Sequence, residues 1–97
     1  MAQQAYVVGR ITVKDAALWA EYRSKVPDTL SPWGAELLFR GEAVATLGGY
    51  EEHSDIVTIG FPSVEAARGW FASPAYQALV ALRQRAADVV LVVYASP

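Results

Sequence analysis

Hydrophobic and polar positions alternate along three stretches of the chain, which is the pattern of β-strands with one buried face. These stretches are Ala5–Val13, Ala35–Arg40 and Ile56–Phe61, and in each of them the odd positions are small or apolar and the even positions are mixed. The odd positions are Val7, Gly9, Ile11, Val13, Ala35, Leu37, Phe39, Val57, Ile59 and Phe61. A fourth stretch, Asp88–Tyr94, is apolar at both sets of positions, as expected of a strand covered on both sides. The pattern therefore predicts four strands.

A helix is predicted between the first two strands. Asp15 is a good N-cap, because its carboxylate can accept a hydrogen bond from a free backbone N–H. The apolar residues Trp19, Tyr22 and Val26 then recur at helical spacing and form one face. Pro27 disfavours an unbroken continuation. We therefore expect the helix to break there, with a short turn over residues 28–33 that stops at Gly34.

The segment Phe61–Ala87 contains two helix start signals. Ser63 is an N-cap with Glu65 in the first turn, and Ser73 is an N-cap followed by Pro74 at the first helical position. The first helix should turn Ala66, Ala67, Trp70 and Phe71 inward, and the second should run from Tyr76 through Leu79, Val80 and Leu82 to about Ala87.

Earlier in the chain, Gly41-Glu42 is predicted to be a turn, residues 43–47 a short strand extension and residues 48–54 a loop.

The predicted order β-α-β-β-α-β is that of the ferredoxin-like α+β fold, in a single domain over residues 1–97. Right-handed crossovers place both helical segments on one face of an antiparallel sheet, above the odd-numbered residues. The other face would carry the residues Tyr6, Val8, Leu38 and Ile56 together with Arg10, Arg40 and Glu36. We expect a second copy to cover this largely apolar face, giving a homodimer whose two sheets face each other.

Composition narrows the functional classes. The chain has 97 residues, is 54% hydrophobic and carries a net charge of −2, so a nucleic-acid partner, which requires a basic surface, is not expected. No cysteine is present, and one histidine cannot form a histidine-cluster metal site. The N-terminal residues 1–8 lack the features of a signal peptide, and the apolar run Val89–Tyr94 is too short to span a bilayer. We expect a cytoplasmic protein without a membrane partner.

Two arginines on the predicted mixed face, Arg10 and Arg40, are candidates for an anion site, because a guanidinium can hold a carboxylate with two hydrogen bonds. The alternative is a structural ion pair with Glu36. Arg83 follows the apolar face of the last helix, where it could reach the mouth of a pocket or remain solvated. His53 lies in the acidic segment 51–55, which could bind a divalent ion but is more simply an exposed loop. We expect no metal and no cofactor.

Aromatic residues concentrate on the predicted helices. They are Trp19, Tyr22, Trp33, Trp70, Phe71 and Tyr76. They could line an apolar ligand pocket between helices and sheet, with the phenols of Tyr22 and Tyr76 as candidate catalytic proton donors. Plain core packing explains the same spacing.

Several segments together resemble the domain-of-unknown-function 1330 (DUF1330) family: GRITV, WAEYRSKVP, FRGE and FPSVEAARGWFASPAYQALVALR. The resemblance covers nearly the whole chain, and its most specific part is the FPS…SPAYQ…LR block. It implies a ferredoxin-like fold in the dimeric α+β barrel superfamily, which also holds cofactor-free monooxygenases and isomerases. Relatives often carry an acidic residue before the Phe-Pro pair, where this chain has Gly60.

Three functional hypotheses remain at this stage. The first is a homodimer that binds a small anionic or aromatic metabolite between sheet and helices, with Arg10, Arg40, Trp19, Tyr22, Trp70, Tyr76 and Arg83 as candidate ligand-binding residues. The second is a cofactor-free oxygenase or isomerase, and the third is a structural dimer without a ligand.

Overall fold

The computed structural model describes residues 4–96. The prediction about a signal peptide concerned residues 1–8, of which residues 1–3 lie outside the described range. Its elements are β1 (Ala5–Val13), α1 (Ala16–Leu30), the 3-10 turn η1 (Ser31–Trp33), β2 (Glu36–Glu42), β3 (Asp55–Phe61), α2 (Val64–Ala72), α3 (Pro74–Gln77), α4 (Val80–Ala86) and β4 (Ala87–Ala95). Within this range, no helix is both long and apolar enough to cross a lipid bilayer.

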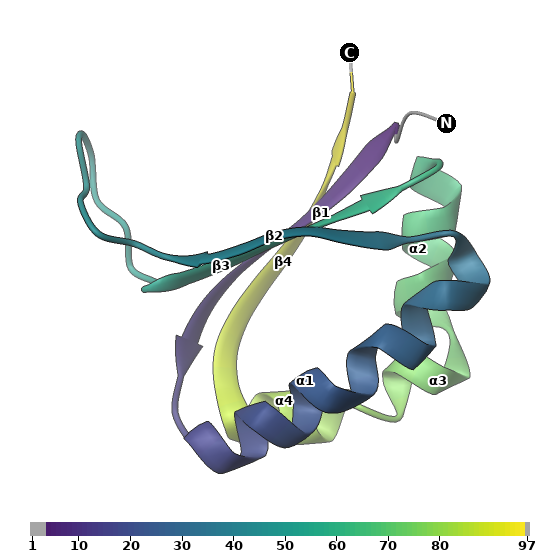
Figure 1. Cartoon of the computed structure of the whole chain (residues 1–97), viewed down its shortest axis with the longest axis horizontal. Helices are drawn as coiled ribbons and strands as arrows, with labels where there is room; N and C mark the ends of the chain where they lie inside the picture. The colour runs from purple at the N-terminus through teal and green to yellow at the C-terminus, as the bar shows by residue number, and fades with distance from the viewer. Residues whose placement is uncertain (1–3, 97) are drawn as a thin grey trace.

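The four strands form one antiparallel sheet in the order β2-β3-β1-β4. The helices lie together on one side of this curved sheet, and the opposite side carries no helix (Figure 1). This is the ferredoxin-like arrangement that the order of elements predicted. The predicted bounds of the first strand, Ala5–Val13, agree with those of β1.

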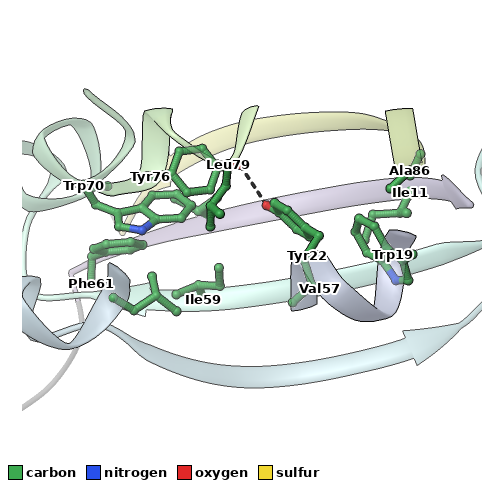
Figure 2. Close-up of a cluster of buried hydrophobic side chains, with 14 of the residues drawn as sticks. Ile11, Trp19, Tyr22, Val57, Ile59, Phe61, Trp70, Tyr76, Leu79 and Ala86 are labelled. Carbon is green, nitrogen blue, oxygen red and sulfur yellow. Dashed lines mark hydrogen bonds between the residues drawn. The ribbon is translucent and has the colours of Figure 1, made fainter. Parts of the chain in front are cut away.

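The hydrophobic core fills the space between the helices and the sheet (Figure 2). Trp70 of α2 lies at one end of it, with its ring centroid 5.5 Å from that of Phe61 and 4.3 Å from that of Tyr76. Its indole N–H donates a hydrogen bond of 3.0 Å to the hydroxyl of Thr29, so the polar atom of this buried ring is satisfied. The odd-numbered residues of β1 and β3 face this core, as predicted.

Helix α1 continues through Pro27 to Leu30, so the predicted break at Pro27 is wrong. Proline removes one backbone donor and crowds the preceding turn. The contacts of the last turn offset this cost, because Thr29 and Leu30 are buried there and Thr29 accepts the hydrogen bond from Trp70. The turn then tightens into η1 and stops at Gly34, as predicted, and Gly34 adopts the left-handed conformation with φ of 65°.

Both predicted serine caps are present in the second helical segment. The Ser63 hydroxyl accepts from the backbone N–H of Ala66 at 3.0 Å, and the Ser73 hydroxyl accepts from that of Tyr76 at 3.3 Å. The prediction of one continuous helix after Pro74 is wrong, because the chain tightens at residues 78–79 and separates α3 from α4. The N–H of Leu79 bonds there to the carbonyl of Tyr76, three residues back, instead of four. Phe71, predicted to face inward, is 41% exposed.

Strand β2 differs from its prediction at a bulge. Leu37 pairs with Ile59, and Phe39 pairs with the adjacent Thr58, so Leu38 has no partner of its own. A single extra residue reverses the faces of all residues beyond it. Phe39 therefore lies on the helix-free face, and Arg40, which pairs with the core residue Val57, lies on the helix side.

The predicted turn at Gly41-Glu42 and the strand extension over residues 43–47 are also wrong. Gly41 and Glu42 belong to β2, and residues 43–54 form an irregular hairpin, here called the arm. Figure 1 shows the arm extending beyond the ends of β2 and β3. At its base the N–H of Ala43 bonds to the carbonyl of Ser54 at 2.7 Å.

The helix-free side of the sheet, here called the open face, exposes several large apolar residues. They are Phe39 on β2 and Val90, Val92 and Tyr94 on β4. The even-numbered residues of β1, from Tyr6 to Thr12, face the same side.

Candidate functional site

A cavity of about 180 Å³ lies between α1 and the sheet. Its walls are mostly apolar and come from α1 and from all four strands, with Trp19 on the helix and Val57 and Leu91 on the sheet among them. An apolar protein cavity of roughly 150 Å³ can hold a benzene ring. The space therefore suits one aromatic ring or a short aliphatic group.

Two cationic side chains, Arg23 and Arg40, also line this cavity. Both residues are exposed, which places the positive charges toward solvent and the apolar walls deeper. Arg40 reaches the cavity because the bulge at Leu38 turns it to the helix side. Within residues 4–96 its guanidinium forms no hydrogen bond and no ion pair. Partial burial and the nearby charge of Arg23 lower the pKa of Arg40, so an anion placed beside it would relieve an unfavourable environment.

The hydroxyl of Tyr22 belongs to a buried chain of hydrogen bonds. It lies 2.8 Å from the hydroxyl of Tyr76, as the dashed line in Figure 2 shows. The guanidinium of Arg83 donates to the same Tyr76 oxygen at 2.8 Å. Tyr22 lines the cavity, whereas Tyr76 is fully buried behind it. The chain therefore connects the cavity to the last turn of α4.

The direction of these hydrogen bonds follows from the chemistry of the three groups. A guanidinium only donates, so the Tyr76 oxygen accepts from Arg83 and its single proton needs an acceptor. An unsatisfied buried donor costs about 1–3 kcal/mol, and the available acceptor is Tyr22. Tyr76 therefore donates to Tyr22. The proton of Tyr22 then has no acceptor among the described residues and is available to a ligand in the cavity.

Burial is the largest cause that raises the pKa of Tyr22 above its ordinary value. Tyr22 therefore keeps its proton at neutral pH and acts as a hydrogen-bond donor. Two donors of different kinds, the phenol of Tyr22 and the guanidinium of Arg40, thus line one cavity. Such a pair suits a ligand with a carboxylate or another electron-rich oxygen.

The structure brings together only part of the residue set predicted to bind a ligand. Trp19 stacks on Tyr22 with ring centroids 5.1 Å apart, and Arg40 lines the same cavity. Tyr76 does not line the cavity but hydrogen-bonds to Tyr22, and Arg83 donates a hydrogen bond to Tyr76. Trp70 belongs to the core and does not line this cavity.

Arg23 was missed by the sequence reasoning, although a signal for it existed. It follows Trp19 by four residues, and residues at this spacing lie on the same side of a helix. The prediction of ligand-binding residues on that face considered its apolar residues and did not include the arginine at its border. Trp33, another predicted aromatic, lies over Gly69 of α2, where the missing side chain makes room for its ring.

Arg10 lies on the open face, so the prediction that it shares a face with Arg40 is wrong. It binds Glu51 of the arm rather than the predicted Glu36, with contacts of 2.7 and 3.0 Å to the two carboxylate oxygens. His53 of the arm lies 2.9 Å from the Thr12 hydroxyl through its Nδ1 atom. Among the described residues, no group of three or more potential metal-binding side chains is close enough to hold an ion.

We predict that Glu51 titrates near pH 2 in the folded protein. The hydrogen bond from Arg10, aided by the backbone N–H of His53, lowers the pKa of Glu51 from its ordinary 4.5 to about 2. Because the folded pKa is depressed, the pair stabilises the arm above pH 4.5 and this contribution is lost as the pH falls toward 2. NMR titration of the Glu51 carboxyl carbon checks the midpoint. In Arg10→Gln the midpoint should return toward 4.5, and an unchanged midpoint would disprove the pairing.

Comparison with known proteins places the chain in a family. The family described as "Domain of unknown function (DUF1330)" matches residues 4–96. No curated protein matches the chain.

Solved structures match over nearly the whole chain. A protein of unknown function from Rhodopseudomonas palustris has a TM-score of 0.81 at 18% identity, covering 100% of this chain and 85% of its own. A dimeric ferredoxin-like protein of unknown function from Jannaschia has a TM-score of 0.72 at 10% identity, covering 96% of this chain and 99% of its own. SnoaB, a cofactor-independent oxygenase from Streptomyces nogalater, has a TM-score of 0.68 at 14% identity, covering 99% of this chain and 95% of its own. At these identities the likeness shows the fold.

Proposed function

The chain belongs to the DUF1330 family, and we propose that it binds a small organic acid, with an aromatic or other apolar body, in the cavity between α1 and the sheet. The observation that carries this proposal is Arg40, a guanidinium without an ion-pair partner among residues 4–96, in the same cavity as the available Tyr22 proton. The apolar body would occupy the inner walls beside Trp19. The carboxylate would meet Arg40 at the mouth.

The composition of the cavity favours this ligand class over two others. A fully apolar ligand would leave the buried Tyr22 hydroxyl proton without an acceptor, which costs free energy, and would not use the positive charge of Arg40. A cationic ligand would face Arg23 and Arg40 with the wrong charge. An acid of about one ring matches both the charge and the volume.

Benzoate and its neutral isostere benzamide test this proposal. We expect benzoate to bind at the cavity and benzamide to bind more weakly, as measured by NMR chemical-shift titration of labelled protein. Arg40→Met should weaken benzoate binding about 10- to 100-fold, because a hydrogen bond to a charged group contributes about 1.5–3 kcal/mol. The affinity for benzamide should change little in this variant.

Arg85→Met is the matched control. Arg85 is also an exposed arginine, but it lies in the last turn of α4 and does not line the cavity. Its replacement should leave the benzoate affinity unchanged. If benzoate, phenylacetate and their amides all fail to perturb the cavity residues, or if Arg40→Met and Arg85→Met behave alike, the proposal is wrong.

We also propose that the working unit is a homodimer in which the open faces of two copies meet. The exposed apolar residues of this face support the pairing, because contiguous apolar surface usually marks an interface. The dimeric ferredoxin-like protein from Jannaschia shows that chains of this fold can pair. The cavity lies on the other side of the sheet and stays accessible in such a dimer.

A cofactor-free oxygenase is the second candidate, favoured by the Tyr22 proton and by the structural likeness to SnoaB. In such an enzyme Tyr22 would donate to a developing oxyanion and Arg40 would hold the charge. An oxygen electrode would record uptake with aromatic acids and phenols as substrates. Full uptake by a Tyr22→Phe, Arg40→Ala double variant would remove both residues from this role.

A further inference from the structure

The arm presents apolar side chains that touch almost nothing in their own chain. Val44 is 97% exposed, Leu47 99% and Tyr50 87%. Residues 43–50 also contain no charged side chain. Single exposed apolar residues are ordinary, but three of them within the uncharged residues 43–50 of a projecting hairpin form a surface suited to another protein.

The arm is held in a defined place relative to the open face. Glu51 is bound by Arg10 and His53 contacts Thr12, and both partners point from β1 toward the open face. In Figure 1 the arm bends away from the helices, toward the helix-free side of the sheet. Its apolar tip and the open face therefore lie on the same side of the molecule.

We propose that the arm of each copy packs against a second copy of this chain through Val44, Leu47 and Tyr50. This inference rests on the proposed dimer through the open face. Pairing two identical faces about a two-fold axis brings in two arms, one from each side, so each tip can reach the partner. The uncharged tip fits a partner surface that is itself apolar, such as the exposed residues of β4.

The surface area of the chain supports an interface with a second copy that covers the arm and the open face. The accessible surface is 6072 Å². A compact monomer of this mass, 10.5 kDa, should expose roughly 5,400 Å². The excess of about 670 Å² approaches the ~800 Å² that each partner contributes to a standard interface. A second copy that covers the arm and the open face would account for this excess.

Sedimentation equilibrium of three proteins tests the inference. They are the wild type, the arm variant Val44→Ser/Leu47→Ser/Tyr50→Ser, and the control Ala43→Ser/Ala45→Ser/Thr46→Ser in the same segment. We expect the arm variant to raise the dimer dissociation constant at least about 100-fold, because it removes apolar area from both arms. The control, which removes little apolar area, should stay near the wild-type value. Circular dichroism should show the same fold in all three, because the tip residues lie outside the core.

The possible failures are distinguishable. A wild type that stays monomeric at all concentrations would disprove the proposed dimer and this inference with it. A dimeric wild type whose dissociation constant changes equally in the arm variant and the control would overturn the role of the arm alone. Neither result bears on the cavity, whose ligand is tested by the benzoate titration.

Discussion

Replacing Trp70 with alanine should lower the free energy of unfolding by about 3–5 kcal/mol, the range for large aromatic residues removed from a core. Trp70 is 2% exposed and packs between Phe61 and Tyr76. The substitution leaves a cavity that the sheet and the helices cannot fill without moving. It also leaves the buried Thr29 hydroxyl without its indole donor. Denaturant unfolding, followed by circular dichroism at one fixed protein concentration, measures the change.

Phe71→Ala is the control for this prediction. Phe71 is the next residue of α2, and the same type of substitution removes a ring that is 41% exposed. We expect a loss of about 1 kcal/mol, since little buried volume disappears. Equal losses for the two variants would show that Trp70 is not the anchor of α2 against the sheet.

Structural features that depend only on residues close together in the sequence were predictable. The alternation in Ala5–Val13 gave the bounds and the buried face of β1, because both follow from the two-residue repeat of a strand. Ser63 and Ser73 marked the starts of α2 and α3, because a cap bonds to a backbone N–H only three residues ahead. The order of these elements then led to the fold.

The face on which Arg40 lies could not be derived in this way. The alternation from Ala35 to Arg40 is regular in the sequence, and Leu38 resembles any other strand residue. The bulge exists because of how β2 pairs with β3, and pairing is a property of two strands together. One unpaired residue moved Arg40 from the open face to the cavity and separated it from Arg10.

Contacts between distant segments account for the remaining differences. The hydroxyls of Tyr22 and Tyr76 meet across 54 positions of sequence, and no local pattern couples them. The continuation of α1 past Pro27 likewise depends on Trp70, which is far away in the chain but bonds to Thr29. Helix propensity is a weak signal when a tertiary contact of this kind stabilises the last turn.

Replacing Val92 with glutamate should weaken the proposed dimer at least about 1000-fold, because each interface would then bury two charges without partners. Val92 lies on the open face of β4, paired with Val8 in the middle of the neighbouring strand. Val92 is midway along β4, which is an edge strand of the sheet, and the exposed Val90 and Tyr94 flank it on the same face, so its charge would lie among apolar residues. The side chain faces away from the core, so the variant should fold as a monomer that sedimentation equilibrium detects.

Val93→Glu provides the matched control, because it places the same charge one residue along the same strand. The exposed fractions of the two side chains are nearly equal, 38% for Val92 and 39% for Val93. Val93 pairs with the core residue Val7 and therefore points to the helix side. If the open face is the interface, only Val92→Glu gives monomers. If both variants remain dimeric, the two copies do not meet through this face. If both dissociate, the substitutions act through the stability of β4, and the assignment of the open face as the interface loses its support.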